Sequence, residues 1–243
     1  FCAAALFSLV AGQYAAAAEE PAKVTNTLTA DDIRYNTETG DARAIGHVVV
    51  KRSDGSVLKG NEAEGNTNKQ VMTIKGNVDG FFPEQNTTLK SDSAKWTGDP
   101  TDETDGTVEA FGKVHLTRKP NDKLDADYVM WKLGTRTYHA RGKVNGIFQK
   151  RILDADEARR DEDKFWAKNV RRYEDQVKKY VLSAETVSGT FTEGDGGEGE
   201  EELLNTLNAN KNVVFDFVDK EGLKTRVTGD NAVYTKESAV VVM

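Results

Sequence analysis

The chain has 243 residues, and 40 acidic against 33 basic side chains give it a formal net charge of −7. This balance argues against general nucleic-acid binding, which depends on Lys and Arg neutralising phosphates. The only cysteine is Cys2, so no disulfide framework is expected, and the chain is long enough to bury a core without one.

Residues 1–18 carry no charge and are rich in Ala, Leu, Val and Phe. The segment is too short for a comfortable membrane span, and it ends in small residues followed by Glu19 and Glu20. It therefore predicts a secretory signal peptide that is cleaved after Ala18. Because the segment has neither an initiator Met nor a basic start, we expect the gene product to begin upstream of Phe1. A second interpretation is that the segment is retained as a membrane anchor.

From residue 19 to residue 243 the sequence is dominated by one motif, Leu-x-Ala-Asp-x-Ala-x-Tyr, which recurs at intervals of about thirty residues. Clear copies begin at Leu28, Leu89, Leu124 and Val227, and weaker copies begin at Leu58, Leu153 and Leu182. A second pattern, Gly-x-Val, lies between them at 46–48, 76–78, 112–114 and 142–144, with degenerate forms at 168–170 and 211–213. Such repeats predict one supersecondary unit stacked on its neighbours in a single elongated domain.

The Gly-x-Val segments show the periodicity of β-strands. Ala44, Gly46 and Val48 share one parity, whereas Arg43 and His47 share the other. In the Leu124 copy the parity changes, because Leu124 and Ala126 have one parity and Val129 the other. A bulge or sharp bend at Asp127 would restore a common inward face, with the carboxylate accepting freed backbone N–H groups.

The fold class predicted from these patterns is all-β, with about seven bent hairpins stacked into an elongated antiparallel structure whose cross-section is a V or a flattened tube. One parity of each strand should face the interior. The residues expected there, which are also the candidate ligand-contacting residues, are Val48, Val50, Leu58, Val78, Leu89, Val114, Leu116, Leu124, Val129, Trp131, Val144, Phe148, Val213, Phe215 and Phe217.

Small residues recur at fixed places in both patterns, among them Gly46, Ala94, Gly142 and Ala155. One interpretation is bulge geometry and close packing of the sheet, which glycine often marks. The other is that these positions leave a continuous cleft for a long apolar ligand.

Two segments depart from the repeat. In 154–178 the spacing of Trp166, Val170, Tyr173 and Val177 is also compatible with an amphipathic helix, but strands are favoured because the repeat resumes in phase at Leu182. The segment 193–202 is rich in Gly and Glu and predicts a disordered loop between strands. A calcium site there is disfavoured because the ordered ligand spacing of such loops is missing.

The sequence offers no motif for catalysis, a cofactor or a metal. His47, His115 and His139 are far apart and lack the spacing of metal ligands, and no nucleophile or phosphate-binding motif is present. Acidic residues that recur in every repeat are more often structural than catalytic. The expectation is therefore a protein that is not an enzyme.

The runs Leu-Thr-Ala-Asp-Asp-Ile-Arg-Tyr at 28–35 and Gly-Asp-Ala-Arg-Ala-Ile-Gly-His-Val at 40–48 resemble the OstA-like (LptA-type) lipopolysaccharide-transport proteins. The resemblance extends over about 24–243. It implies a periplasmic protein with a V-shaped antiparallel β-jelly roll, whose apolar groove holds the acyl chains of lipopolysaccharide. It implies no catalytic residue.

The resemblance also implies partners of like fold. Units of this family join end to end by edge-strand pairing, in head-to-tail homo-oligomers and with an inner-membrane transporter subunit and an outer-membrane assembly protein. Two alternatives remain open: a structural β-scaffold with a filled core, and a subunit of the same system tethered to the inner membrane.

Overall fold

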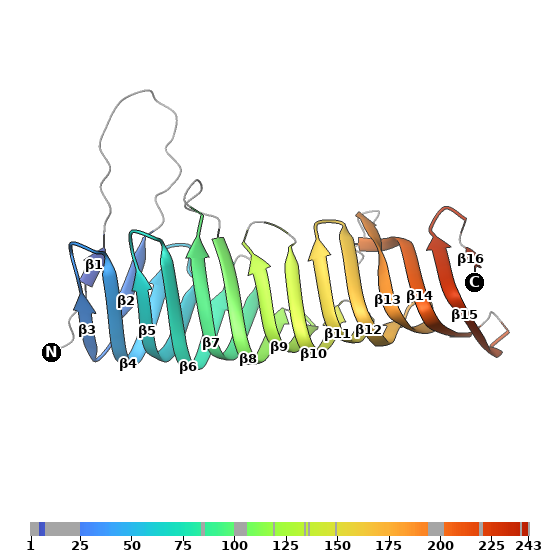
Figure 1. The fold of residues 1–243 in the computed structure, drawn as a ribbon, viewed down its shortest axis with the longest axis horizontal. Coiled ribbons are helices and arrows are strands. Elements are labelled where there is room, and N and C mark those ends of the chain that lie inside the picture. Colours follow the sequence, from blue (N-terminus) through green and yellow to red (C-terminus); the bar gives the residue numbers. More distant parts are fainter. Residues whose placement is uncertain are drawn as a thin grey trace, which may run out of the picture. The chain divides into compact units, whose positions relative to one another are not determined.

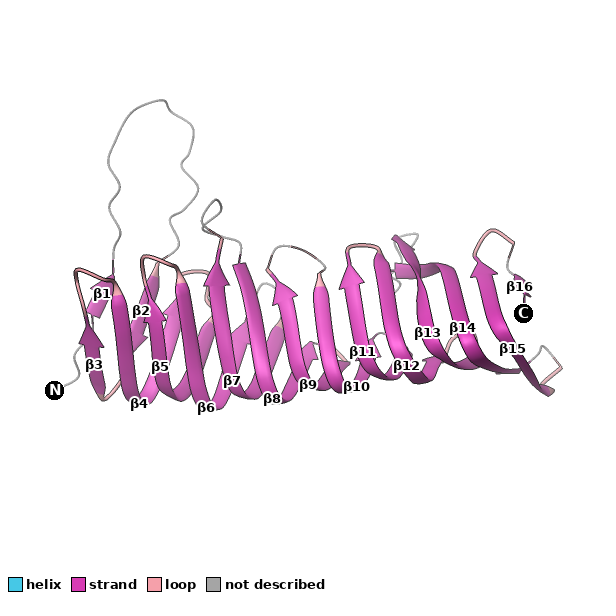
Figure 2. Ribbon diagram, in the orientation of Figure 1, coloured by secondary structure: helices cyan, strands magenta, loops and turns pink. Residues whose placement is uncertain are grey.

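The structure is a computed structural model that describes residues 5–7, 25–83, 86–99, 106–118, 120–133, 135, 137–148, 150–193, 202–218, 221–238 and 240–242. These residues form strands and turns without a helix, which confirms the predicted all-β class (Figure 2). The predicted signal peptide lies outside the described residues except for 5–7, and the predicted acidic loop lies outside them except for its two ends.

The chain divides into two units, Phe1–Gly112 and Lys113–Met243. Unit 1 holds β1 (Ala5–Phe7), β2 (Asn26–Thr29), β3 (Asp32–Tyr35), β4 (Asp41–Arg52), β5 (Val57–Asn66), β6 (Val71–Phe82) and β7 (Thr87–Gly98). The strand β8 (Gly106–Arg118) contributes residues to both units. Unit 2 holds β9 (Asp122–Lys132), β10 (Tyr138–Phe148), β11 (Arg151–Asp161), β12 (Lys164–Asp175), β13 (Tyr180–Glu193), β14 (Glu202–Val218), β15 (Lys224–Thr235) and β16 (Val240–Val242).

Within each unit the strands form an open antiparallel sheet in chain order, as the ribbon shows (Figure 1). The one variation is in unit 1, where β2 and β3 both pair with β4, β2 along one half of it and β3 along the other. The repeat copy at 28–35 is thus a single strand interrupted at Ala30 and Asp31. The backbone N–H of Asp31 donates to the carbonyl of Gly46 at 2.9 Å across this break.

The long strands bend back on themselves. On β12, Phe165 and Tyr173 are eight positions apart, yet their ring centroids lie 6.4 Å apart. An extended strand would separate the two residues by about 26 Å. In unit 1 the guanidinium of Arg52 lies 5.6 Å from the ring centroid of Trp96. Across the sheet Trp96 is level with Ala42, which lies at the opposite end of β4 from Arg52. The side chains of Arg52 and Trp96 can therefore approach each other only because the strands bend.

The bend coincides with a β-bulge in the strands that carry Gly-x-Val. Between Arg141 and Asn145, β10 has three residues where β9 has two. The first two of these three, Gly142 and Lys143, have φ angles of 75° and 51°. Gly46–His47, Gly76–Asn77 and Gly112–Lys113 repeat this pair of left-handed residues. A bulge with consecutive left-handed residues turns the strand sharply, and glycine adopts the first position without strain.

On β9, the strand that carries Asp127, burial follows the predicted change of parity. Leu124 and Ala126 are buried, Asp127 is exposed, and burial resumes at Val129 on the other parity. The position of the bend was therefore predicted correctly, but the extra residue belongs to the neighbouring strand β10 and not to the strand of Asp127.

The segment 154–178 consists of β11, β12 and the turn that follows, which confirms strands over the helical alternative. Its helix-like spacing comes from bulges in β12, which place Ala167, Val170 and Tyr173 in the core at intervals of three residues.

Candidate functional site

The interior of each unit is lined by apolar side chains at equivalent places on every second strand. One valine follows each Gly-x bulge, and its exposed fraction is 1% at Val48, 2% at Val78, 1% at Val114 and 0% at Val144. Val170 and Val213 occupy the same place at 3% and 1% exposure. Because the bulge turns the backbone immediately before each valine, these side chains lie on the inside of the bend.

Most of the predicted interior residues are placed as expected. Exposed fractions of 0–8% are found at Val48, Val50, Val78, Leu89, Val114, Leu116, Leu124, Val129, Trp131, Val144 and Val213. Leu58, Phe215 and Phe217 are half-buried. The prediction for Phe148 is wrong, because this side chain is 39% exposed. It is the last residue of β10, where its ring lies against Gly146.

The recurring bulge glycines are explained by the bend of the strands and by a contact with the neighbouring strand. A Cβ atom on Gly142 would lie 2.4 Å from Asp127 Oδ2, and one on Gly46 would lie 2.2 Å from Asp31 Oδ2. Gly112 has the same relation to Asp92. The motif aspartate of one strand thus packs against the bulge glycine of the next, and both the left-handed backbone and this contact require the missing side chain. We call the place where the motif aspartate of one strand meets the bulge of the next strand a corner.

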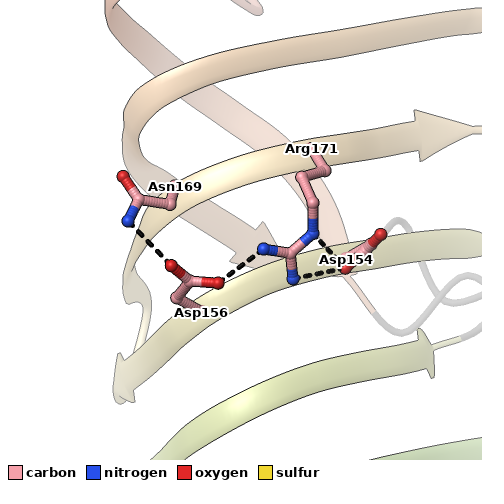
Figure 3. Close-up of polar contacts among 4 residues, drawn as sticks. All are labelled: Asp154, Asp156, Asn169 and Arg171. Carbon is pink, nitrogen blue, oxygen red and sulfur yellow. Dashed lines mark hydrogen bonds and ion pairs between the residues drawn. The ribbon is translucent and has the colours of Figure 1, made fainter.

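The corner on β11 and β12 has no glycine and is held by side chains (Figure 3). Arg171 donates from Nε and Nη2 to Asp154 Oδ1 at 2.9 and 2.7 Å, and from Nη1 to Asp156 Oδ1 at 2.5 Å. Asn169, the left-handed residue of this bulge, donates to Asp156 Oδ2 at 2.8 Å. The hydrogen bonds from Arg171 and Asn169 hold the pKa of Asp156 below its usual value.

These contacts predict an acid-dependent contribution to stability. The pKa of Asp156 is lower in the folded chain than its usual 3.8, so its contribution is present above about pH 4 and is lost as the pH falls through the folded value. Arg171→Gln should lower the unfolding midpoint in urea at pH 7, and the difference from wild type should shrink below pH 3.8. Because the corner is exposed, the loss should be small.

Lys164→Gln is the matched control for this measurement. It removes the same charge from the exposed side of the same strand, and Lys164 is not among the groups that lower the pKa of Asp156. A pH-independent difference between Arg171→Gln and wild type would contradict the role given to Asp156.

The sequence did not predict a row of aromatic side chains near the strand ends of unit 2. We call this set the aromatic row: Phe165, Tyr173, Tyr180, Phe191, Phe215 and Phe217. Neighbouring ring centroids in the row lie 4.9–6.4 Å apart. The guanidinium groups of Arg151 and Arg160 lie 5.6 and 5.1 Å from the ring centroid of Phe191. The row joins residues from both halves of the bent strands, so no periodicity along one strand could reveal it.

The three histidines each contact a carboxylate. His47 Nδ1 lies 2.8 Å from Asp31, His115 Nδ1 lies 2.5 Å from Asp125, and His139 Nε2 lies 2.7 Å from Glu157. Burial alone would raise the pKa of Glu157. The hydrogen bonds from Arg159 and His139 lower this pKa by more, so its net shift is downward. Among the described residues no three His, Cys, Asp or Glu side chains gather as a metal site would require.

Comparisons with known proteins do not assign the chain: a scan against protein-family models and a search of curated proteins both gave no match. In the described part of the chain, no helix is long and apolar enough to cross a membrane.

Proposed function

We propose that this protein is a periplasmic carrier that holds acyl chains of lipopolysaccharide in the interior of its bent sheets and passes them toward the outer membrane. In this proposal each unit is a segment of a V-shaped β-jelly roll. The repeat pattern supports it, since both motifs resemble those of the OstA-like transport proteins. The partners proposed with it are like-folded proteins that pair with an edge strand such as β16, among them an inner-membrane transporter subunit and an outer-membrane assembly protein.

The observation that carries the proposal is the row of equivalent interior valines within each unit. Val48 and Val78 in unit 1, and Val144, Val170 and Val213 in unit 2, occupy the same place on every second strand. Each CH₂ group removed from water contributes about 0.8 kcal/mol. A chain that moves between equivalent apolar places keeps this contribution throughout, so it can slide without crossing water.

The burial of the interior favours a second candidate, a structural β-scaffold with a filled core. Exposed fractions of 0–8% mean that the interior side chains already exclude solvent by contacting one another. Under the carrier proposal, an entering chain must separate the two halves of the strands. The scaffold has no need of such a movement.

Photocrosslinking separates the two candidates. Benzoylphenylalanine in place of Phe215 keeps an aromatic side chain at a half-buried inward position, and the same substitution at the adjacent Val214 lies on the opposite face of β14. The carrier proposal predicts a lipopolysaccharide adduct at position 215 and little at 214, detected by mass spectrometry of protein purified from the periplasm. Equal labelling at both positions, or no adduct at either, would support the scaffold.

A further inference from the structure

Unit 2 contains two buried hydroxyl groups that the packing of the interior does not use. Tyr173 is 6% exposed and Tyr180 is half-buried, and neither hydroxyl makes a well-formed hydrogen bond to any other group within the described residues. The two hydroxyls interact with each other, and such a pair uses only one of its two O–H donors. The two groups lie close enough to act on each other's ionisation, and burial raises the pKa of Tyr173 to about 12. Leaving a hydroxyl unpaired in an apolar interior costs free energy that phenylalanine would avoid.

The hydroxyl pair lies between the corner and the ends of the strands. The register pairs Tyr173 with Leu182 and Tyr180 with Phe217, on the side of the corner nearer to the strand ends. The residues nearer to the corner are aliphatic, namely Val170, Ala184 and Val213. The interior of unit 2 is therefore hydrocarbon next to the corner and polar at the level of the two tyrosines.

Charged groups lie beside this polar level. Arg151 and Asp175 both influence the ionisation of the two hydroxyl groups, and they form an ion pair at 3.6 Å. Asp175 Oδ1 also accepts the backbone N–H groups of Val177 and Lys178, so its carboxylate is engaged in the turn after β12. The tyrosine hydroxyls are the uncharged groups at this level that can turn a hydrogen bond toward a ligand.

We infer that the Tyr173 and Tyr180 hydroxyls bind the polar junction of an acylated ligand, the ester or amide carbonyl where a fatty chain joins its head group. The inference rests on the proposed carrier function and adds a positioning site to it. The chain lies against the aliphatic residues near the corner, and the carbonyl oxygen accepts a hydrogen bond from a tyrosine hydroxyl. The ligand enters by moving Phe165, which stacks on Tyr173 at 6.4 Å, together with Phe191, which contacts Phe165 at 4.9 Å.

Two soluble probes with the same chain length test this site. Sucrose monodecanoate has an ester carbonyl between sugar and chain, and decyl maltoside has a glycosidic oxygen there and no carbonyl. By titration calorimetry, wild-type protein should bind the ester about tenfold more tightly, which corresponds to one net hydrogen bond of ~1.4 kcal/mol. The double variant Tyr173→Phe/Tyr180→Phe keeps both rings, so it should lose this preference while its affinity for decyl maltoside is unchanged.

Tyr234→Phe is the matched control. Its hydroxyl accepts a hydrogen bond from Lys178 at 3.0 Å in the same unit, so this variant should keep the ester preference. If wild type and the double variant bind both probes equally, the carrier proposal stands and the tyrosine site is overturned. If wild type binds neither probe, the carrier proposal itself fails. A double variant that also unfolds at lower urea than wild type would indicate that the hydroxyls are structural, which also overturns the site.

Discussion

Gly142→Ala is expected to destabilise the protein by about 2–4 kcal/mol. Part of the loss comes from forcing a side chain into a left-handed backbone at φ 75°, which costs roughly 1–2 kcal/mol. The rest comes from crowding, because the new Cβ would lie 2.4 Å from Asp127 Oδ2 and 2.8 Å from Asp127 Cβ. The measurement is the free energy of unfolding in urea, followed by the fluorescence of the tryptophans.

Gly146→Ala on the same strand is the control for this prediction. Its φ is not in the left-handed region, and the three atoms nearest to the added Cβ all belong to the ring of Phe148, which is 39% exposed and can turn outward. The loss should therefore stay below about 1 kcal/mol. A further test combines Asp127→Gly with Gly142→Ala, because removing the aspartate side chain relieves the crowding of the new Cβ. The loss of unfolding free energy in this double variant should therefore be smaller than the sum of the two single losses. Equal losses for the two alanine variants would contradict the corner geometry.

The corner shows how far the sequence predicts this fold. The change of parity between Ala126 and Val129 located the bend correctly, because a strand can bury both only if it turns between them. It did not show which strand carries the extra residue. A partial signal was present in two copies of Gly-x-Val, because asparagine at 77 and histidine at 47 are residue types enriched in the left-handed conformation, whereas lysine at 113 and 143 is not.

Phe148 shows where parity fails. The alternation that buries Val144 and Gly146 would also bury Phe148, but burial requires covering residues as well as direction. At the last position of β10 the strand ends opposite Arg151, and the ring turns back over Gly146. Periodicity specifies the face of a strand and contains no information about what lies beyond its end.

The aromatic row lay beyond prediction for a different reason. Tyr173 belongs to the helix-like spacing, which the bulges of β12 explain. Its contact with Phe165 joins residues that are far apart on the strand and meet only because the strand bends. Once the corners are located, pairing the strands in register and folding each at its corner would have placed Phe165 opposite Tyr173.

Leu182→Ala should lower the free energy of unfolding by about 2–5 kcal/mol, the range for truncating a fully buried leucine. Leu182 is 0% exposed and belongs to the core of unit 2, where Tyr173 and Phe215 are its partners across the neighbouring strands. Val181→Ala, on the opposite face of β13 and only half-buried, should cost less than about 1 kcal/mol. Similar losses for the two variants would mean that the core does not lie on the side of Leu182.

The same unfolding measurement in the presence of decyl maltoside decides what the interior is for. If the interior binds acyl chains, the detergent should stabilise wild type by an amount that grows with its concentration, about 2.7 kcal/mol at one hundred times the dissociation constant. Leu182→Ala should gain at least as much, since the removed side chain leaves room for the chain beside Tyr173 and Phe215. If the core is a filled scaffold, wild type should gain nothing below the micelle concentration. Stabilisation confined to the variant would then reflect only the cavity made by the substitution, and the carrier proposal would be rejected.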